Sequence, residues 1–344
     1  MKKLIISSLE RDVGKTSLIL GLTALYPGSF TYIKPLGDRL VYQDKKLWDH
    51  DAKLVGSLFN LQDDPTTMSL GFDHSKLRFQ YNRLEMETAL REMADRHQNN
   101  VDLLIVETGR DMARGTTVHL DPCSICRAIG GKQVLVVGGI HDRIMDDLLF
   151  FDRHLEHREQ EIAGVILNKV KQKPDFLKEF KKILGTLRFP ILGIIPYLPE
   201  LSYPTVRNIA DTLSARILTS EDYLDVDVKD IFVGAMSADA VLRLEKFKHP
   251  EKVIITSGDR SDMILSALNS ECVGIVLTNN ILPPPNIIAQ VADKNVPLLS
   301  VQNDTFQIAK KIDLMIPLIN HESPERIKLI QDMVRENVNT ELLW

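Results

Sequence analysis

Short, uninterrupted apolar runs recur along the chain and alternate with segments of helical periodicity. Because the runs are continuous, they are typical of strands that are covered on both faces of a sheet. An apolar stripe with helical spacing extends from Leu18 to Tyr26, and a second one extends from Met86 to Ala94. Strands that alternate with helices predict a mainly parallel α/β sheet flanked by helices. The runs in the N-terminal part lie at 4–6, 103–106, 134–137, 164–167 and 191–195.

A second, smaller α/β series begins near residue 229. A final helix is expected over 321–338, because Ser323-Pro324-Glu325 is a typical helix start. Between the two series, the segment 219–228 is polar and acidic and is interpreted as a linker. We therefore predict a first domain at 1–218 and a second at 229–344 that includes the C-terminal helix. The strands expected in the second domain are 231–233, 253–255, 273–277 and 297–299, with helices at 259–269, 284–293 and 303–311.

Composition places the chain among soluble globular proteins of about two domains. It has 344 residues, 44% hydrophobic and 26% charged, with a formal net charge of −5, which is ordinary for such proteins. The charge lacks the basic excess of proteins that bind nucleic acid. No apolar run reaches the roughly 18 residues of a membrane span, and the N-terminal apolar stretch is too short for a signal peptide. We expect a cytoplasmic protein without nucleic-acid or membrane partners.

The strongest chemical motif follows the first predicted strand. The segment Val13-Gly14-Lys15-Thr16-Ser17 stands at the start of a helix and has the chemistry of a phosphate-binding loop. Gly14 would let backbone N–H groups approach a phosphate, Lys15 would supply a charge, and the Thr16 hydroxyl could ligate Mg²⁺. The complete pattern requires a glycine at position 9, where Leu9 stands. The alternative is a helix start that contains Gly-Lys-Thr without any function.

Three further charged residues follow predicted strands or precede a helix on the same side of the sheet. Lys34 comes after a short strand expected at 31–33, Asp51 precedes a helix, and Glu107 ends the strand 101–106. The carboxyl ends of parallel strands form the usual ligand edge, so these side chains could reach the phosphate loop. Carboxylates there could organise Mg²⁺. Each residue also has a structural alternative, a surface lysine before a proline or an acid at a helix N-terminus.

The order of these motifs resembles dethiobiotin synthetase and the related ATP-dependent amidoligases over roughly the first 215 residues. The resemblance rests on Val13-Gly14-Lys15-Thr16, Lys34-Pro35, Asp51, Glu107, the segment Gly164–Asn168 and the segment Pro196–Pro199. It implies ATP and Mg²⁺ as cofactors and a P-loop NTPase-like fold.

The resemblance also implies a role for each matching residue. Lys15 and Lys34 would act on the transferring phosphoryl group, and Thr16, Asp51 and Glu107 would hold Mg²⁺. Asn168 would read adenine, with Pro196 in a second base-contacting loop. Lys171 stands where guanine-binding proteins carry an aspartate in a similar Asn-Lys motif, which favours ATP.

Departures from that family fall on the substrate side of the expected site. Asp38 stands where dethiobiotin synthetase has a substrate-binding serine, and Arg110 and Arg114 enter a run that is otherwise made of small residues. We therefore expect no dethiobiotin synthesis. Two functions stay open, a nucleotide-binding regulatory protein and an ATP-dependent carboxylate–amine ligase with another substrate. Because dethiobiotin synthetases build their site at a dimer interface, a homodimer is expected.

The C-terminal series resembles the DRTGG domain, with Asp259-Arg260 after one strand and Thr278-Asn279-Asn280 after the next. The pairing of the two domains resembles the N-terminal region of long phosphotransacetylases, whose acetyl-transferring domain is not in this sequence, so we expect no acetyl phosphate synthesis. Asp259, Arg260 and Thr278 could bind an unknown small ligand at the strand ends. Alternatively, Asp259 and Arg260 form a local structural pair.

Two of the three cysteines form a Cys-x-x-Cys pair, Cys123 and Cys126. A closed zinc site needs four ligands, and the third cysteine, Cys272, lies far away in the sequence. At a spacing of three residues on a helix, the two side chains could simply pack together. Both a structural and a redox or metal role stay open.

Overall fold

The structure, a computed structural model, describes the chain except residues 44, 98–100, 155–161, 235 and 316–322. It divides into two compact units. The first comprises Met1–Leu198 together with Ile319–Trp344, and the second comprises Pro199–Leu318. The second unit is thus inserted, along the chain, between the body of the first unit and its C-terminal helix.

The first unit is built on a six-stranded, fully parallel sheet with the order β2-β5-β1-β6-β7-β8. Every predicted apolar run of this part overlaps one of its strands, so the parallel α/β fold is confirmed. An antiparallel hairpin of β3 and β4 lies outside this sheet and was not predicted. The strands of this unit are β1 (Lys2–Ser8), β2 (Phe30–Ile33), β3 (Leu40–Gln43), β4 (Lys46–Asp49), β5 (Leu103–Glu107), β6 (Lys132–Gly138), β7 (Ile162–Val170) and β8 (Ile191–Pro196).

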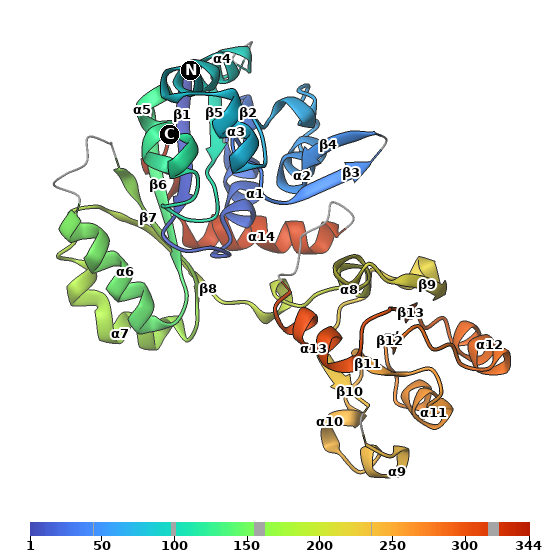
Figure 1. The fold of residues 1–344 in the computed structure, drawn as a ribbon. Coiled ribbons are helices and arrows are strands. Elements are labelled where there is room, and N and C mark those ends of the chain that lie inside the picture. The colour runs from blue at the N-terminus through green and yellow to red at the C-terminus, as the bar shows by residue number, and fades with distance from the viewer. Residues whose placement is uncertain (44, 98–100, 155–161, 235, 316–322) are drawn as a thin grey trace. The chain divides into compact units, whose positions relative to one another are not determined.

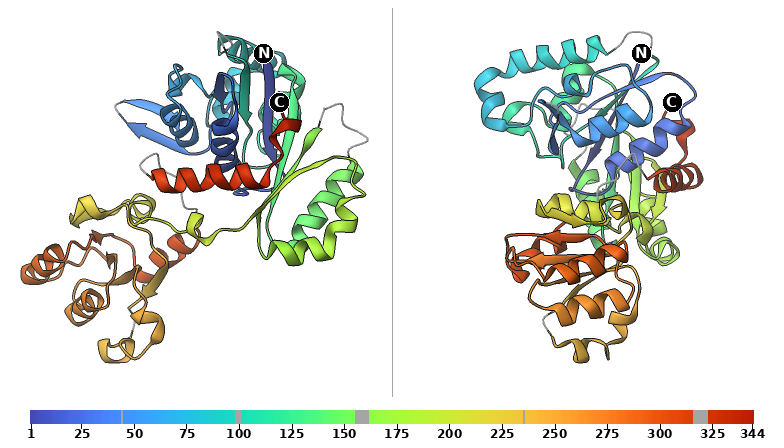
Figure 2. Two further views of the ribbon diagram at one scale, coloured as in Figure 1. Left: turned by 180° about the vertical axis from the view of Figure 1, so that it is seen from behind. Right: turned by 90° about the vertical axis from the view of Figure 1, so that its right-hand side faces the viewer.

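Helices cover both faces of this sheet (Figures 1 and 2). On one face, α4 and α5 bury apolar side chains against β1, β2 and β5, and α6 and α7 do so against β6 and β7. Several of these helices begin at residues whose side chains cap the first turn, such as Asp49, Asn82 and Asp121. The helices are α1 (Lys15–Leu25), α2 (His50–Leu58), α3 (His74–Gln80), α4 (Arg83–Arg96), α5 (Pro122–Ile129), α6 (His141–His154), α7 (Lys173–Leu184) and α14 (Pro324–Asn337).

The second unit contains a five-stranded sheet with the order β10-β11-β12-β13-β9. Four strands are parallel, and β9 pairs antiparallel to β13 at one edge. Its strands are β9 (Arg216–Thr219), β10 (Asp230–Val233), β11 (Lys252–Ser257), β12 (Gly274–Thr278) and β13 (Leu298–Ser300). Its helices are α8 (Val206–Leu213), α9 (Ala238–Val241), α10 (Glu245–Lys248), α11 (Ser261–Asn269), α12 (Pro285–Asp293) and α13 (Thr305–Asp313).

The division into units differs from the boundaries expected from the sequence. The expected linker, 219–228, packs within the second unit, because Leu224 and Val228 are buried in its core. The C-terminal helix exists as expected, although 321–322 lie outside the described residues, but α14 packs on α1 of the first unit (Figures 1 and 2). The polar, acidic character of 219–228 reflects its exposed positions and does not mark a free linker.

None of the helices in the described part of the chain is long and apolar enough to cross a membrane.

Candidate functional site

The loop between β1 and α1 has the backbone geometry of an anion-binding turn. Asp12 and Gly14 both adopt left-handed backbone angles, with φ of 61° and 90°. A Cβ atom on Gly14 would lie 2.5 Å from Nδ2 of Asn168, so only glycine fits. α1 begins directly after Gly14, and no acidic residue lies in its first turn. The N–H groups of this turn are therefore suited to an anion.

Lys15 points into this loop from the first turn of α1. Its side chain is buried, and Nζ donates to Oγ of Ser8 at 2.8 Å and to the carbonyl oxygen of Arg110 at 3.1 Å. Burial lowers the pKa of Lys15, an effect that Glu107 partly opposes. Both acceptors are neutral, so a phosphate, as a charged acceptor, would bind the Lys15 ammonium more strongly than they do.

Residues at the carboxyl end of β7 hold the loop from the other side. Nδ2 of Asn168 donates to the carbonyl of Val13 at 2.8 Å, and Nζ of Lys169 donates to the carbonyl of Asp12 at 2.8 Å. Oδ1 of Asn168 accepts from the backbone N–H of Lys169. These contacts hold the backbone carbonyls of Asp12 and Val13 and so fix the shape of the loop. The sequence motif marked Asn168 as a base contact and did not reveal this second role.

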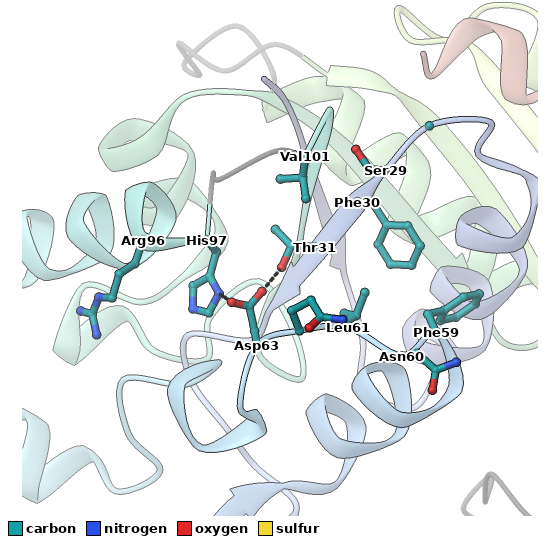
Figure 3. Close-up of a pocket in the computed structure, with 12 residues that line it drawn as sticks. Ser29, Phe30, Thr31, Phe59, Asn60, Leu61, Asp63, Arg96, His97 and Val101 are labelled. Atoms are coloured by element: carbon teal, nitrogen blue, oxygen red, sulfur yellow. Dashed lines mark hydrogen bonds and ion pairs between the residues drawn. The ribbon is translucent and has the colours of Figure 1, made fainter.

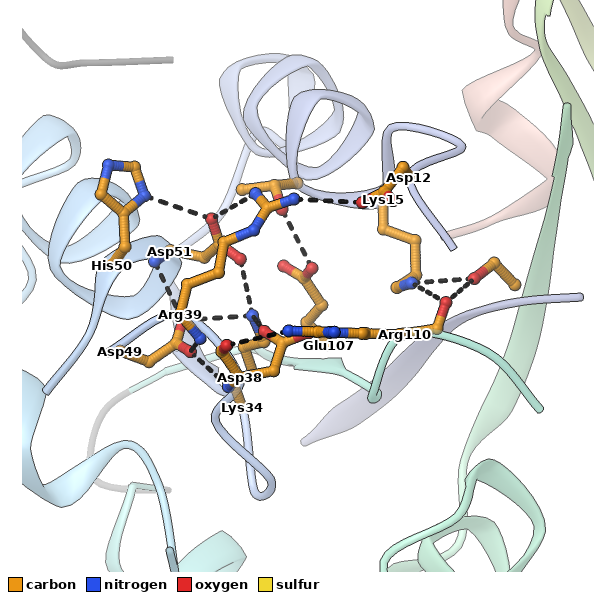
Figure 4. Close-up of polar contacts among 12 residues, drawn as sticks. Asp12, Lys15, Lys34, Asp38, Arg39, Asp49, His50, Asp51, Glu107 and Arg110 are labelled. Atoms are coloured by element: carbon orange, nitrogen blue, oxygen red, sulfur yellow. Dashed lines mark hydrogen bonds and ion pairs between the residues drawn. The ribbon is translucent and has the colours of Figure 1, made fainter. Parts of the chain in front are cut away.

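Lys34, at the end of β2, lies among three carboxylates (Figure 4). Its Nζ is 2.6 Å from Asp38, 3.2 Å from Asp49 and 2.6 Å from Asp51. Burial lowers the pKa of Lys34, but the surrounding carboxylates, Asp51 first, outweigh it and hold the pKa well above the usual range. Burial alone would raise the pKa of Asp51, and Lys34 reverses this to well below the usual range. Lys34 and Asp51 are therefore both held in their charged forms.

Asp49 organises this cluster and was not identified as a site residue from the sequence. One of its oxygens caps α2 at the N–H of Asp51, at 2.9 Å. The other accepts the backbone N–H groups of Asp38 and Arg39 at 2.9 and 3.1 Å. The signal that could have found it is its position directly before the helix that contains Asp51, where an aspartate commonly caps the first turn.

Glu107, at the end of β5, connects the loop to the second strand. Oε1 accepts from the Thr16 hydroxyl at 3.0 Å, and Oε2 accepts from the Tyr32 hydroxyl at 2.8 Å. Burial raises the pKa of Glu107 to about 7, although Lys34 acts in the opposite direction. The predicted strand-end carboxylate therefore lies against the first turn of α1.

Oxygen donors of the kind that Mg²⁺ prefers lie at this edge of the sheet. The Thr16 hydroxyl and the carboxylates of Asp51 and Glu107 are the hard oxygen donors that Mg²⁺ prefers. Asp51 interacts electrostatically with Glu107, and both are fully buried. Among the described residues, Asp38, Asp49 and Asp51 also have ligand atoms within 4.8 Å of one another. The chemistry of these donors fits the ion.

Two arginines, Arg39 and Arg110, lie beside the carboxylates of the cluster (Figure 4). Nε of Arg110 is 3.0 Å from Asp38, and its Nη2 donates to the Asp38 carbonyl at 3.3 Å. Arg39 extends from the start of the β3–β4 hairpin toward Asp51 and Asp12. The sequence indicated Arg110 as a departure from the resembled family, whereas Arg39 was not noticed.

The expected base-contacting segments lie at the ends of two adjacent strands. β7 ends at Val170 and β8 at Pro196, and these two residues are paired in register. Tyr197 donates its backbone N–H to Val170 at 3.0 Å, and the Lys171 ammonium lies 5.2 Å from the Tyr197 ring centre. Asn168 and Pro196 are thus brought to the same part of the sheet edge.

In the second unit, Asp259, Arg260 and Thr278 lie at the ends of adjacent strands. Ser257 of β11 is paired in register with Thr278 of β12. Arg260 forms a two-pronged contact with Asp262, at 3.0 and 3.1 Å, and donates to the carbonyl of Met236. Thr278 is buried, with its hydroxyl 3.4 Å from that of Thr305. A ligand role for these residues stays a prediction. Arg260 is paired locally, but its partner is Asp262, whereas the structural alternative named Asp259.

A separate pocket of about 570 Å³ lies at the opposite, amino end of β2 (Figure 3). Asp63 lies between two other side chains that line it. One Asp63 oxygen accepts from the Thr31 hydroxyl at 2.7 Å, and the other lies 3.0 Å from Nδ1 of His97. These contacts tie the segment after α2 to β2 and α4. The polar side chains of this pocket therefore have a structural role, and the pocket lies at the end of β2 opposite the phosphate loop.

The Cys-x-x-Cys pair lies on α5. Cys126 belongs to the hydrophobic core beside Ile125, Cys123 is partly buried, and neither is in a disulfide. Of the groups that could hold a metal within the described part of the chain, none includes these cysteines. Packing accounts for Cys126.

Comparison with known families assigns both parts of the chain. The profile of the family described as AAA domain matches residues 2–205, and the DRTGG domain profile matches 208–315. Curated relatives are phosphate acetyltransferases. The enzyme of Pseudomonas putida is 30% identical over 196 residues, 53% of this chain and 28% of the relative. That of Synechocystis sp. is 26% identical over 96% of this chain.

The chain spans about half the length of the relatives that it matches from end to end, 50% for the Synechocystis enzyme. Among solved structures, a plasmid partition protein of Borrelia burgdorferi bound to AMPPNP covers 58% of this chain and 88% of its own, with 14% identity and a TM-score of 0.38. The CBS and DRTGG domains of a Clostridium perfringens pyrophosphatase cover 33% of this chain and 47% of their own, with 24% identity and a TM-score of 0.29. Scores this low carry no inference beyond similarity.

Proposed function

Because the chain belongs to the AAA domain family through residues 2–205 and continues into a DRTGG domain, we propose that it is a Mg·ATP-binding regulatory protein. It is related to phosphate acetyltransferases over its whole length. The proposed role corresponds to the N-terminal region that precedes the acetyl-transferring domain in long phosphotransacetylases. ATP would bind at the loop 12–17, and the DRTGG unit would respond to a second small ligand.

The observation that carries nucleotide binding is the loop geometry around Lys15. The left-handed turns at Asp12 and Gly14, the N-terminus of α1 and the buried ammonium of Lys15 converge on one point. A triphosphate can replace the Ser8 hydroxyl and the Arg110 carbonyl as partner of Lys15, since a charged acceptor binds an ammonium more strongly. Thr16, Asp51 and Glu107 would hold Mg²⁺, which neutralises the charge of the phosphates.

Adenine would be bound at the edge formed by the ends of β7 and β8. After its contacts to Val13 and Lys169, the Asn168 side chain retains one N–H donor and one acceptor lone pair. This is the pair of groups that asparagine uses to bind the N6 and N7 positions of adenine. Lys171 offers no carboxylate for a guanine amino group, so ATP is preferred to GTP.

The contacts of Lys34 and Arg110 favour a regulatory role over a ligase, because both side chains are already paired with carboxylates of the chain itself. Lys34, which would act on a transferring phosphoryl group in a ligase, is bound by Asp38, Asp49 and Asp51. The Arg110–Asp38 pair lies in the region that the resembled enzymes leave to their substrate. A carboxylate substrate would have to displace Arg110 and would be repelled by Asp38.

The proposal is tested by incubating the full chain with Mg·ATP, with and without a pool of carboxylate metabolites. The regulatory function predicts saturable ATP binding and no new product that depends on Lys15. A ligated product together with ADP and phosphate, absent with Lys15→Ala, would support the alternative, a carboxylate–amine ligase. No ATP binding at all would contradict both. The homodimer and the cytoplasmic location remain proposals, and sedimentation with and without ATP tests the former.

A further inference from the structure

Arg39 connects the phosphate loop to the proposed metal ligands. Its Nη2 lies 3.3 Å from Asp12 of the loop, and its Nη1 lies 3.5 Å from Asp51. The guanidinium group therefore spans the interval between the two walls of the site (Figure 4). Neither the motifs of the sequence nor the comparisons assign a role to this residue.

The contacts of Arg39 are longer than those of the neighbouring cation. Lys34 binds Asp38 and Asp51 at 2.6 Å and is buried, whereas Arg39 is 3.3 and 3.5 Å from its partners with 29% of its side chain exposed. An ion pair that is long and partly exposed to water contributes little stability. Arg39 can therefore exchange its partners at a smaller cost than Lys34.

The backbone of Arg39 is nevertheless fixed at the base of the β3–β4 hairpin. Its N–H donates to the buried Asp49 at 3.1 Å, and its carbonyl accepts from the N–H of His50 at 2.7 Å. The backbone of Arg39 is therefore fixed, while its charged side chain extends to Asp12 of the phosphate loop. A planar guanidinium matches two oxygens of a phosphate.

We propose that Arg39 binds the terminal phosphate of the nucleotide and distinguishes a triphosphate from a diphosphate. On binding, the guanidinium leaves Asp12 for the phosphate oxygens, since a doubly charged acceptor attracts it more strongly than a single carboxylate. The guanidinium also leaves Asp51, which keeps its contact to Lys34 and has one contact fewer to give up when it binds Mg²⁺. This inference rests on the proposed nucleotide binding.

The test compares ADP with the β,γ-imido analogue of ATP by titration calorimetry on the full chain, each with Mg²⁺. Arg39→Gln should weaken binding of the triphosphate about 10- to 100-fold, as expected for the loss of a charge-assisted contact. Binding of ADP should change less than about threefold. Arg39→Lys keeps the positive charge but lacks the planar guanidinium, so its affinity for the triphosphate should lie between those of Arg39→Gln and the wild type. Arg188→Gln, which removes an arginine paired with Asp152, serves as the control and should bind both nucleotides as the wild type does.

A structural role for Arg39 would lower the thermal stability or weaken both nucleotides equally, and it would leave their affinity ratio unchanged. An unchanged ratio in Arg39→Gln therefore overturns this inference while nucleotide binding stands. Failure of the wild type to bind either nucleotide overturns the proposed function itself, and the role of Arg39 with it. If Arg39→Gln lowers the ratio of triphosphate affinity to ADP affinity and leaves the melting temperature unchanged, Arg39 is supported as the contact to the terminal phosphate.

Discussion

The ammonium of Lys34 lies 2.6 Å from a carboxylate oxygen of Asp51, and both side chains are buried at the carboxyl edge of the first sheet. Asp38 and Asp49 complete a cluster in which one lysine serves three acids. A buried ion pair of this kind is poor evidence for net stability, but removing one partner leaves an uncompensated charge. The two partners are unequal here, because Asp51 also has Arg39 and His50 beside it.

This inequality predicts an order of destabilisation. Lys34→Met leaves three carboxylates without their common cation and should cost about 3–5 kcal/mol of unfolding free energy. Asp51→Asn leaves Lys34 with two acids and should cost clearly less. Urea unfolding in the presence of EDTA measures both. Lys46→Met removes the exposed pair with Asp64 and should cost only about 0–1 kcal/mol. Equal effects of Lys34→Met and Lys46→Met would contradict the charged cluster.

Glu107 gives the stability a defined pH dependence without Mg²⁺. Burial raises its pKa from 4.5 to about 7, so the folded state holds the proton more tightly than the unfolded state. The stability from this group is fully present below pH 4.5 and is lost as the pH rises to about 7. Glu107→Gln removes this titration. The melting temperature of the variant, relative to the wild type, should therefore rise between pH 5 and pH 8 in EDTA. A constant difference across that range would show that the carboxyl does not titrate there.

The contact between α1 and α14 predicts a compensating pair of variants. A Cβ atom on Gly21 would lie 2.3 Å from Cγ2 of Val334. Gly21→Ala should therefore destabilise the protein by about 1–3 kcal/mol through overpacking, despite the better helix propensity of alanine. Adding Val334→Ala should restore much of this loss. A double-mutant cycle by urea unfolding measures the coupling between the two positions. If the changes in unfolding free energy simply add, the contact between α1 and α14 is contradicted.

The sequence predicted those features that depend on local patterns. The apolar runs predicted both sheets, and Gly14-Lys15-Thr16 predicted the loop that the structure shows between β1 and α1. The antiparallel edge strand β9 was missed, because 216–219 is partly buried and lies in a segment that resembled the approach to a linker. The sequence also predicted α14 but could not show its partner, since any apolar helix face fits several surfaces.

Within the site, the sequence located groups that follow strands and missed those defined by contacts across the chain. Lys34, Asp51 and Glu107 were identified by position, and the structure brings them to one edge. Asp49 and Arg39 were missed, because their roles arise from hydrogen bonds to residues 10 to 27 positions away. Such partners are set by the loop and hairpin geometry rather than by a local motif.

The central claim, that the loop around Lys15 binds Mg·ATP, is tested most directly by titration calorimetry of the full chain with the β,γ-imido analogue of ATP. The account predicts saturable binding by the wild type and a loss of about 1.5–3 kcal/mol of binding free energy in Lys15→Ala. Lys181→Ala, on the exposed face of α7, is the matched control and should bind as the wild type does. Equal affinity of the wild type and Lys15→Ala, or no binding by the wild type, would contradict the account.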